Sequence, residues 1–349
     1  MGLLDFLGSG KPKIAIDLGA DSIKVLQLEG SPGNYKLRNF TIEYLEEGNI
    51  SEGIVKENIK VGEVIKEALG TTGMKAKAIV TGVAGRSVII KFIKLQNKSD
   101  QELDGDIKHE ATTYIPFDIS EVVMDYAKLG VDSTDMVDIM LTAIKREDIE
   151  TLNAFFSSIN MTPGIVDVTP MAIFNTLEAN YDLEDDKSYA LINLGCSMTN
   201  VIMVDKRVPK FARDIFNGGL NFTKFIERLR KLEFKEAEKF KKAQRENVSE
   251  LYNLIGNPLG ELVREINGTF EYVNGMGFAP LSRIYLCGGS ALIPNIKDYF
   301  VNQFGTETEI LNPFNKIEIV GSTIDTHYLD AIAPQLATGV GLAIRAITG

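Results

Sequence analysis

The sequence contains little that could support metal or redox chemistry. Its 349 residues include two cysteines, two histidines and no tryptophan. Cys196 and Cys287 stand far apart, and neither belongs to a spacing typical of a metal site. The scarcity of histidine also disfavours a His-rich zinc site. Both cysteines therefore fit reduced, partly buried thiols in a reducing compartment.

Positive charge is also in short supply. The chain has 37 basic and 48 acidic residues, which gives a formal net charge of −11. A nucleic-acid-binding protein normally presents a dominant basic field, so this balance argues against nucleic acid as a partner. The locally basic stretch 224–245 is interleaved with acids at helical spacing. We interpret it as the solvated face of a helix.

Long apolar runs are absent as well, and no run approaches the roughly 18–20 residues that span a bilayer. The apolar start, residues 1–8, is too short for a signal peptide, and Phe6 stands where myristoylation needs Ser or Thr. We therefore expect a cytosolic start and no direct membrane insertion. Hydrophobic residues make up 44% of the chain, and its length suffices for two domains with separate cores.

The most informative feature of the sequence is an internal repeat. Residues 13–28 read KIAIDLGADSIKVLQL, and residues 189–204 read YALINLGCSMTNVIMV. Asp17 is matched by Asn193, and Gly19 by Gly195, about half a chain length later. Each copy is a short apolar run that ends in Asp or Asn, a turn with glycine and small polar residues, and a second β-rich run. This pattern predicts two strand–turn–strand hairpins.

Such hairpins are suited to binding phosphate. Tight glycine turns leave backbone N–H groups free to form an anion site, and glycine permits close approach. The hydroxyls of Ser22, Ser197 and Thr199 would add donors, and Asp17 could hold a hydrated Mg²⁺. One Asp-x-Gly after a strand is usually only a turn. Two copies half a chain apart favour two hairpins that grip a polyphosphate.

The rest of the chain mixes strands and helices, which indicates the α/β class. Strands are predicted at 35–44, 76–83, 86–95, 121–128, 137–143, 165–168, 208–214 and 283–286. Helices are predicted at 57–69, 100–114, 146–159, 293–300 and 331–347, and over 220–274 with breaks near 234, 247 and 256. The segment from about 85 to 160 interrupts the order that the two halves share, so we interpret it as an inserted subdomain.

Further glycine and charged residues are candidates for the same site. Gly218 and Gly219 precede a predicted helix, where they either present N–H groups to an anion or form an ordinary turn. Gly288, Gly289 and Ser290 follow a strand, and bare backbone there would let a base or ribose lie against it. Glu238 and Lys241 share a helix face, although without the other elements a surface ion pair would be the favoured explanation of that spacing.

Together these elements resemble the actin-like ATPase superfamily of actin, sugar kinases and heat-shock chaperones. The resemblance implies duplicated, ribonuclease H-like lobes with Mg-ATP between them. It implies a first phosphate loop of Asp17, Gly19, Ala20, Asp21, Ser22 and Lys24, and a second of Asn193, Gly195, Cys196, Ser197, Met198 and Thr199. The resemblance implies that the residues around ribose and adenine are Gly218, Gly219, Glu238, Lys241, Gly288, Gly289 and Ser290. Residues 333–343 resemble the second connecting helix of the superfamily.

This resemblance also implies a division into domains. The first lobe comprises residues 1–84, 160–186 and 335–349, and the inserted subdomain comprises 85–159. The second lobe comprises 187–216 and 282–334, with a helical subdomain at 217–281.

Within the superfamily, the chain is most similar to the PilM family of type IV pilus assembly. The segment 110–126, EATTYIPFDISEVVMDY, carries that similarity together with the stretch from Asp17 to Lys24. The resemblance implies a cytoplasmic ATP-binding scaffold, peripheral at the inner membrane. It would bind the N-terminal cytoplasmic peptide of the inner-membrane protein PilN, contact components of the pilus motor or platform, and possess a capacity for self-association. The cleft between the first lobe and its insertion is the predicted peptide groove, with Tyr114, Pro116 and Phe117 as candidates; core packing and helix termination are the alternative for each.

Two departures from the superfamily pattern bear on catalysis. Asn193 and Thr169 stand where carboxylates usually help to hold Mg²⁺ or to orient the attacking water. Because phosphoryl transfer depends on positioning and charge, we expect slow or negligible hydrolysis.

Two other functions stay open. One is a sugar or acid kinase, for which we find no substrate-facing base. The other is an FtsA-like cell-division protein, which would end in an amphipathic membrane helix.

Overall fold

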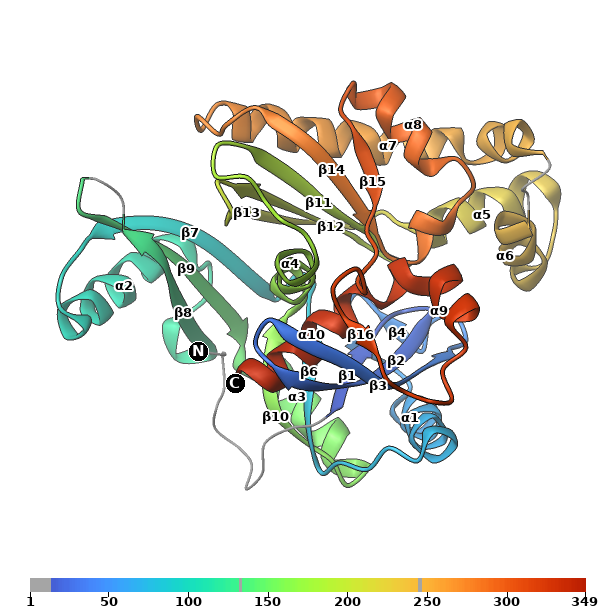
Figure 1. Cartoon of the computed structure of the whole chain (residues 1–349), viewed down its shortest axis with the longest axis horizontal. Helices are drawn as coiled ribbons and strands as arrows, with labels where there is room; N and C mark the ends of the chain where they lie inside the picture. The colour runs from blue at the N-terminus through green and yellow to red at the C-terminus, as the bar shows by residue number, and fades with distance from the viewer. Residues whose placement is uncertain (1–13, 132–133, 244–246) are drawn as a thin grey trace.

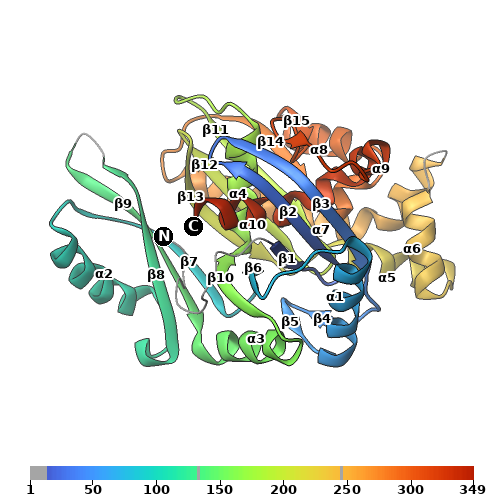
Figure 2. The ribbon, with the colours of Figure 1, turned by 60° about the horizontal axis from the view of Figure 1, so that its bottom comes forward.

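A computed structural model describes residues 14–131, 134–243 and 247–349. The start of the chain and Lys13 of the first repeat lie outside the described residues. Two lobes stand one above the other, and a third, smaller unit projects from their side (Figure 1). The turned view shows the same unit, formed by β7, β8, β9 and α2, standing apart from the lobe sheets (Figure 2).

The first lobe is built on a mixed sheet. In spatial order its strands are β10 (Thr162–Val168), β6 (Ala78–Val83), β1 (Ile14–Leu18), β2 (Ser22–Ser31), β3 (Asn34–Tyr44) and β16 (Glu318–Ile319). β1, β2 and β3 form an antiparallel meander, whereas β6 and β10 run parallel to β1. A small hairpin of β4 (Ile50–Ser51) and β5 (Ile54–Val55) follows the meander.

The second lobe repeats this arrangement. Its strands are, in spatial order, β13 (Val208–Ile215), β12 (Thr199–Asp205), β11 (Ser188–Leu194), β14 (Leu281–Cys287) and β15 (Thr308–Ile310). Here too, an antiparallel meander is extended by two parallel strands. The duplicated topology confirms the predicted actin-like α/β class.

Helices cover both faces of the first sheet because its central strands are apolar on both sides. On one face lie α1 (Asn58–Thr72) and α3 (Arg146–Ser158), which pack Ile65 and Phe156 against β1 and β2. On the other face lies α10 (Ala337–Thr348), beside α4 (Thr169–Asn180). A Cβ at Gly341 would lie 1.7 Å from the carbonyl oxygen of Ala172, so glycine permits the close approach of α10 and α4.

The C-terminal helical region differs from its prediction. A single helix was expected over 331–347, but the chain forms α9 (Thr326–Ile332), a 3₁₀ turn (Ala333–Leu336) and α10. Among the described residues, Thr326–Thr348 is the one helical stretch long and apolar enough to cross a membrane, and 67% of its most apolar window is buried inside the protein. The expectation that no run reaches spanning length was therefore too strict.

The helices of the second lobe are α5 (Gly219–Arg230), α6 (Phe234–Ala243), α7 (Val248–Asn274) and α8 (Ile296–Phe304). The predicted break near Gly256 is wrong, because α7 continues through Gly256 and Pro258. Its buried stripe packs on α5 and on the sheet, and this packing outweighs the local preference of both residues. α8 begins three residues later than predicted, after Asn295 with its left-handed φ of 59°.

The inserted unit has a core of its own. Its antiparallel strands are, in spatial order, β7 (Val88–Gln96), β9 (Met136–Lys145) and β8 (Val122–Val131), and α2 (Asp100–Tyr114) covers one face. α3 was assigned to this insertion, but its phenylalanines lie in the core of the first lobe. We accordingly propose that the insertion ends near Lys145.

The return of the chain to the first lobe also comes earlier than residue 335. β16 pairs with β3, and Ile317, Leu329 and Ile332 are buried in the first lobe. The predicted boundaries as a whole stay a prediction.

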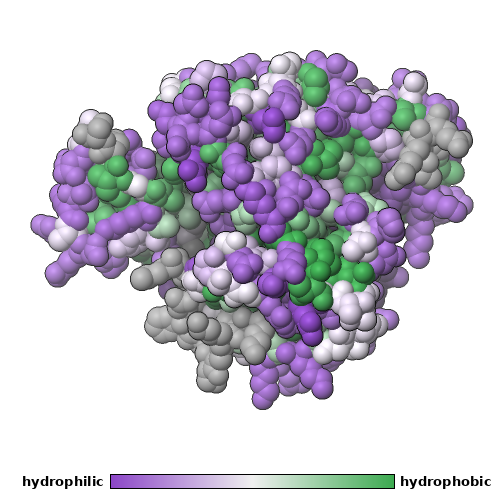
Figure 3. Space-filling model, in the orientation of Figure 1, coloured by the Kyte–Doolittle hydropathy of each residue, from purple (hydrophilic) through white to green (hydrophobic). Residues whose placement is uncertain are grey.

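The face of the protein in Figure 3 is mainly hydrophilic, with apolar atoms gathered between the two lobes and on the insertion at the left.

Candidate functional site

The two glycine hairpins line one cleft of about 330 Å³ between the lobes. β1 and β11 occupy equivalent central places in their sheets, and each is followed at its carboxyl end by a glycine turn into an antiparallel partner. The apolar runs build the strands, and the polar residues begin where the strands end. The structure thus brings the two halves of the sequence repeat to one site.

The first hairpin carries a charge pair. Asp17 and Lys24 lie opposite each other in register, and the Lys24 Nζ stands 3.4 Å from the Asp17 Oδ2. Lys24 also donates to the Ser22 carbonyl oxygen at 3.3 Å, and the Gly19 N–H donates to the same oxygen at 3.2 Å. Both charged side chains are mostly buried yet line the cleft. This end of the site therefore offers a positioned ammonium beside a carboxylate.

The second hairpin carries amides in place of charges. Asn193 donates from its Nδ2 to the Asn200 Oδ1 at 2.8 Å, and Gly195 donates from its N–H to the Met198 carbonyl oxygen at 3.1 Å. Burial, helped by the charge of Asp21, raises the pKa of Cys196 to about 11. The thiol beside the cleft is therefore neutral rather than a nucleophile.

The glycine pair before α5 does not present a free N–H from Gly219. That N–H donates to the Gly195 carbonyl oxygen at 2.9 Å, and a Cβ at Gly218 would lie 2.6 Å from the Cys196 carbonyl oxygen. This geometry shows a packing role that neither of the two interpretations included. Gly218 and Gly219 let the start of α5 lie directly against the second hairpin.

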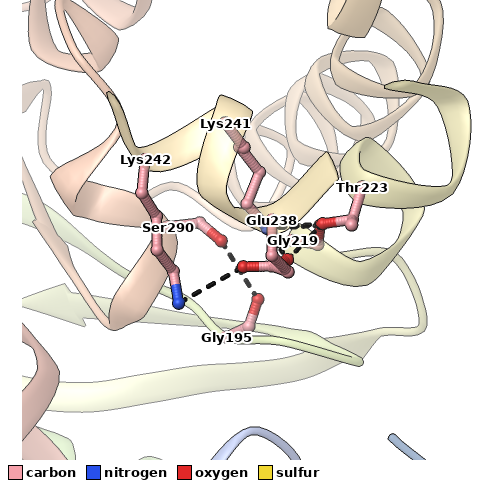
Figure 4. A network of polar contacts seen from close by, with 7 residues as sticks. All are labelled: Gly195, Gly219, Thr223, Glu238, Lys241, Lys242 and Ser290. Carbon is pink, nitrogen blue, oxygen red and sulfur yellow. Dashed lines mark hydrogen bonds and ion pairs between the residues drawn. The ribbon is translucent and has the colours of Figure 1, made fainter. Parts of the chain in front are cut away.

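Glu238 and Lys241 form a polar network at the edge of the cleft (Figure 4). Lys241 donates to the Thr223 Oγ1 at 2.7 Å, to the Gly219 carbonyl oxygen at 3.0 Å and to the Glu238 Oε1 at 2.5 Å. Burial opposes the ionisation of Glu238, but the charge and hydrogen bond of Lys241 and the hydroxyl of Thr223 leave its pKa below the usual range. The pair is thus a buried ion pair that braces α6 against α5, and not a surface pair.

Gly288 closes the third side of the cleft. Its φ is +87°, and a Cβ there would lie 2.4 Å from the Asn193 Oδ1 and 2.6 Å from the Leu194 carbonyl oxygen. Only glycine fits this position. Gly289 is exposed, while the buried Ser290 donates to the Gly195 carbonyl oxygen at 3.4 Å.

Most predicted site residues meet at this cleft. They are Asp17, Gly19, Ala20, Asp21, Ser22, Lys24, Asn193, Gly195, Cys196, Ser197, Met198, Gly219, Glu238, Lys241, Gly288, Gly289 and Ser290. Thr199 and Gly218 do not line it. Thr199 is buried and donates its hydroxyl to the Asn217 carbonyl oxygen at 2.8 Å, so it is not an available phosphate donor.

Sequence reasoning missed several residues of the cleft wall, including Tyr44, Thr338, Asn200 and Lys242. Asn200 could have been found, because it occupies the place in the second repeat that Lys24 occupies in the first. Tyr44 and Thr338 come from elements that only the folded chain brings to the site.

Contacts between the lobes also cross one edge of the cleft. The Lys224 Nζ lies 3.0 Å from the Glu47 Oε1, and the Lys242 Nζ lies 5.2 Å from the centre of the Tyr44 ring. Burial disfavours the charge on Lys242, yet nearby Asp21 and Glu238 raise its pKa overall. These residues hold the helical subdomain of the second lobe against the first lobe.

A second cavity, of about 630 Å³, lies between the first lobe and the insertion. Its walls include Ala127 and Met140 of the insertion, and Met171, Phe174 and Asp167 of the first lobe. Burial raises the pKa of Asp167, although the charge of Arg345 and the Val168 N–H oppose this rise. The cavity combines apolar side chains with charged ones, which include the carboxylates of Asp125, Asp167 and Glu178.

The predicted groove residues do not line this cavity. Side chains alternate across β8 and β9, so that one set packs under α2 while Ala127 and Met140 face the cavity on the other side. Phe117 packs on the α2 side, with the Lys145 Nζ 4.3 Å from its ring centre, and Tyr114 and Pro116 are exposed. A cavity does lie between the first lobe and the insertion, where the peptide groove is predicted, but Tyr114, Pro116 and Phe117 lie outside its lining.

No group of three or more His, Cys, Asp or Glu side chains within residues 14–131, 134–243 and 247–349 could hold a metal ion. The carboxylates that line the cleft are those of Asp17, Asp21 and Glu238, and Glu238 is paired with Lys241. Such a site fits Mg²⁺ that keeps most of its waters and takes the rest of its ligands from a bound phosphate chain.

Comparison with known proteins adds a family to this geometry. The family model described as type IV pilus assembly protein PilM matches residues 15–347. The chain is also similar to a chain of a solved PilM-PilN type IV pilus biogenesis complex, with 26% identity and a TM-score of 0.86. That match covers 97% of this chain and 99% of the other.

More distant structures share the fold alone. The ethanolamine utilization protein EutJ from Carboxydothermus hydrogenoformans is 14% identical, with a TM-score of 0.59 over 95% of this chain and 89% of that chain. MreB5 of Spiroplasma citri bound to AMPPNP is 13% identical, with a TM-score of 0.57 over 97% of this chain and 96% of that chain.

Proposed function

Because the chain belongs to the PilM family of type IV pilus assembly proteins, we propose that it is an ATP-binding scaffold with two ligands. One is Mg-ATP in the cleft between the lobes. The other is the N-terminal cytoplasmic peptide of a PilN-like inner-membrane protein. By holding both, it would act at the cytoplasmic face of the inner membrane and connect the envelope complex to the motor or platform.

The convergence of the two hairpins on one cleft carries the nucleotide half of this proposal. Lys24 supplies a cation, the turns at Gly19 and Gly195 permit close approach of phosphates, and Asp17 would hold hydrated Mg²⁺. The fold relative MreB5 binds AMPPNP. Bound ATP would bridge the two lobes, with its phosphates against both turns.

We further propose that hydrolysis is slow or negligible. Asn193 offers an amide where the superfamily pattern has a carboxylate, and its Nδ2 is held by Asn200. Thr169, at the cleft wall, offers a hydroxyl where the pattern has a second acid. With both acids missing, the site retains the groups that bind phosphate but lacks those that orient a water.

Calorimetry and a steady-state hydrolysis assay on the same preparation test this half. We expect saturable binding of ATP that depends on Mg²⁺, together with little release of phosphate. Absence of binding at millimolar ATP would overturn the nucleotide assignment. Brisk turnover would overturn the scaffold assignment while leaving the site in place.

The partner half rests on the second cavity. It lies in the cleft predicted to take the peptide, and it is large enough for several side chains of an extended segment. The solved relative at a TM-score of 0.86 is a PilM-PilN complex. Met171 and Phe174 offer apolar contacts, and Asp167 offers a charged one.

Two variants locate the peptide. Ala127→Arg fills the cavity from the insertion side, and we expect it to weaken binding of the organism's own PilN-like N-terminal peptide at least tenfold. Phe117→Ala changes the other face of the same sheet and should leave the affinity within about twofold. The affinities are measured by fluorescence anisotropy. A loss of affinity in Phe117→Ala but not in Ala127→Arg would place the peptide on the α2 side of the sheet.

A further inference from the structure

A continuous row of side chains crosses the second sheet at the level of the cleft. Cys287, Asn193, Asn200 and Asp214 lie opposite one another in register on the four neighbouring strands β14, β11, β12 and β13. Cross-strand neighbours in register are the closest side-chain pairs of a sheet. The row therefore connects the cleft to the outer edge of the sheet.

Hydrogen bonds run along this row in one direction. The Cys287 Sγ donates to the Asn193 Oδ1 at 3.8 Å, and the Asn193 Nδ2 donates to the Asn200 Oδ1 at 2.8 Å. The Asn200 Nδ2 then donates to the Asp214 Oδ1 at 2.7 Å. An ionised carboxylate only accepts, so Asp214 sets the orientation of both amides.

The row ends on the root of the insertion. The second oxygen of Asp214 accepts the Gly85 N–H at 3.1 Å, in the connection between β6 and β7. Gly85 has a φ of +108°, and a Cβ there would lie 2.6 Å from the Glu52 carbonyl oxygen. Next to it, the Arg86 guanidinium lies 4.0 Å from the centre of the Phe216 ring, just beyond β13. The base of the insertion is thus fastened to the second lobe.

The strand that carries Asp214 also reaches the peptide cavity. Pro209, near the start of β13, lines that cavity. Asp214 is five positions after Pro209 along the extended strand, which corresponds to about 17 Å. One strand therefore contacts the nucleotide row at one end and the proposed peptide site at the other.

We propose that this row, with Asp214 as its positioning residue, couples the nucleotide cleft to the peptide cavity. The inference rests on the proposed function and adds its regulation. Phosphates bound at the second hairpin fix Asn193, and the row transmits that restraint to Gly85 and β7. The restrained insertion then holds its wall of the cavity in the peptide-binding position. Nucleotide therefore tightens peptide binding, and the peptide tightens nucleotide binding by the same factor.

The chemistry of Asp214 gives a direct test. In Asp214→Asn, the Asn200 and Gly85 donors compete for one amide oxygen, so one of the two links is lost or both amides must reverse. We expect Mg-ATP to tighten peptide binding at least fivefold in the wild type. In Asp214→Asn, the ratio of the peptide affinity with Mg-ATP to the affinity without it should fall to within about twofold of one. The peptide affinity of the nucleotide-free protein should be retained.

A double variant should rescue the coupling. In Asn200→Asp/Asp214→Asn, the carboxylate at 200 accepts from Asn193 and from the new amide at 214, whose oxygen accepts the Gly85 N–H. Every link is satisfied again and Asn193 keeps its orientation. As a matched control, Asp205→Asn removes a buried carboxylate of the same sheet that accepts the Ala279 N–H at 2.9 Å outside the row. It should lower stability but leave the ratio unchanged.

Peptide affinities with and without Mg-ATP, and hydrogen exchange of the segment 85–95, separate the outcomes. ATP should slow that exchange in the wild type and the double variant, but not in Asp214→Asn. The proposed coupling is overturned if Asp214→Asn leaves the affinity ratio or the exchange pattern unchanged. It is also overturned if the double variant folds but does not recover the wild-type affinity ratio. If the wild type binds ATP but no peptide, the partner assignment fails, and the exchange data still decide the coupling to the insertion.

Discussion

The two lobes share a topology but differ at the places where their hairpins meet the cleft. In the first lobe the register row reads Asp17, Lys24 and Ile42 across β1, β2 and β3. In the second lobe the equivalent row reads Asn193, Asn200 and Asp214. The first lobe keeps its carboxylate at the cleft, paired with a cation, whereas the second carries its carboxylate two strands away at the sheet edge.

A reciprocal difference lies on the parallel side of the sheets. Asp167 of β10 stands beside Gly82 of β6. The equivalent place in the second lobe, beside Cys287 at the end of β14, belongs to the fully buried Leu311. Besides Asp17, which faces Asn193 in the comparison, Asp167 of the first lobe and Asp214 of the second are therefore carboxylates without a counterpart at the equivalent place in the other lobe.

Asp214 and Asp167 are both directed toward the insertion. Asp214 accepts a hydrogen bond from its root, and Asp167 lines the cavity beneath it. The matched apolar positions build the duplicated fold, whereas Asp214 and Asp167 lie where the inserted unit meets the two lobes. Variants that exchange or remove the differences between the lobes test this division of roles.

The largest effect is expected at Gly288, where the second lobe needs glycine and the first has Val83 in the equivalent place. Gly288→Ala would drive a Cβ against Asn193 and Leu194 at a positive φ. We expect a loss of about 2–4 kcal/mol in the free energy of unfolding and no measurable nucleotide binding. In Gly289→Ala the nearest atom would be 3.9 Å away, so this control should unfold like the wild type in urea.

The charge pair of the first lobe should matter more for nucleotide than the amide pair of the second. Lys24→Met removes the buried ammonium from the cleft, and we expect nucleotide affinity to fall on the order of 100-fold. Asn200→Ala, at the equivalent place, should cost less than about tenfold. Titration with a fluorescent ATP analogue compares the two, and a larger loss for Asn200→Ala would reverse the assigned roles of the lobes.

Placing a carboxylate at position 193, the equivalent of Asp17, should make the two lobes more alike at the cleft. In Asn193→Asp the new carboxylate can still accept from the Cys287 thiol, but it can accept from Asn200 only after the Asn200 amide reverses and gives up its bond to Asp214. We expect about a tenfold rise in Mg-dependent phosphate release. The rise should disappear when Asp17→Asn is added. No change in turnover would mean that Asn193 is not what limits hydrolysis.

The sequence was sufficient to predict the elements that depend on local pattern. The alternation in the two repeats predicted both hairpins, and the spacing of Leu103, Ile107 and Ala111 predicted α2. α4 gave no such signal, because the helix is buried nearly all round and its apolar residues show little periodicity. α7 was interrupted in the prediction at a glycine that tertiary packing overrides.

The parts of the sites that depend on register and on sheet faces could not be predicted. Asp214 becomes important only through its position opposite Asn200 and next to Gly85, which is distant in sequence. Tyr114 and Phe117 belong to the right subdomain, but a sequence does not tell which face of an inserted sheet meets the neighbouring lobe. Strand alternation supplies that information once the partner of the insertion is known.

The smallest effect concerns Asp167, whose equivalent in the second lobe is the apolar Leu311. Burial raises the folded-state pKa of Asp167, so the ionised form is less favourable in the folded chain than in the unfolded chain. This cost is absent well below the ordinary aspartate pKa of 3.8, appears as the pH rises toward the folded-state pKa, and is complete above it. Asp167→Asn should therefore raise the free energy of unfolding at neutral pH by about 1 kcal/mol, and the gain should shrink on acidification. Asp205→Asn, which removes a carboxylate paired with Lys210 at 3.3 Å, should instead destabilise the protein. Urea unfolding from pH 5 to 8 would show the gain, and a loss of stability in Asp167→Asn would mean that Asp167 serves the fold and not the cavity.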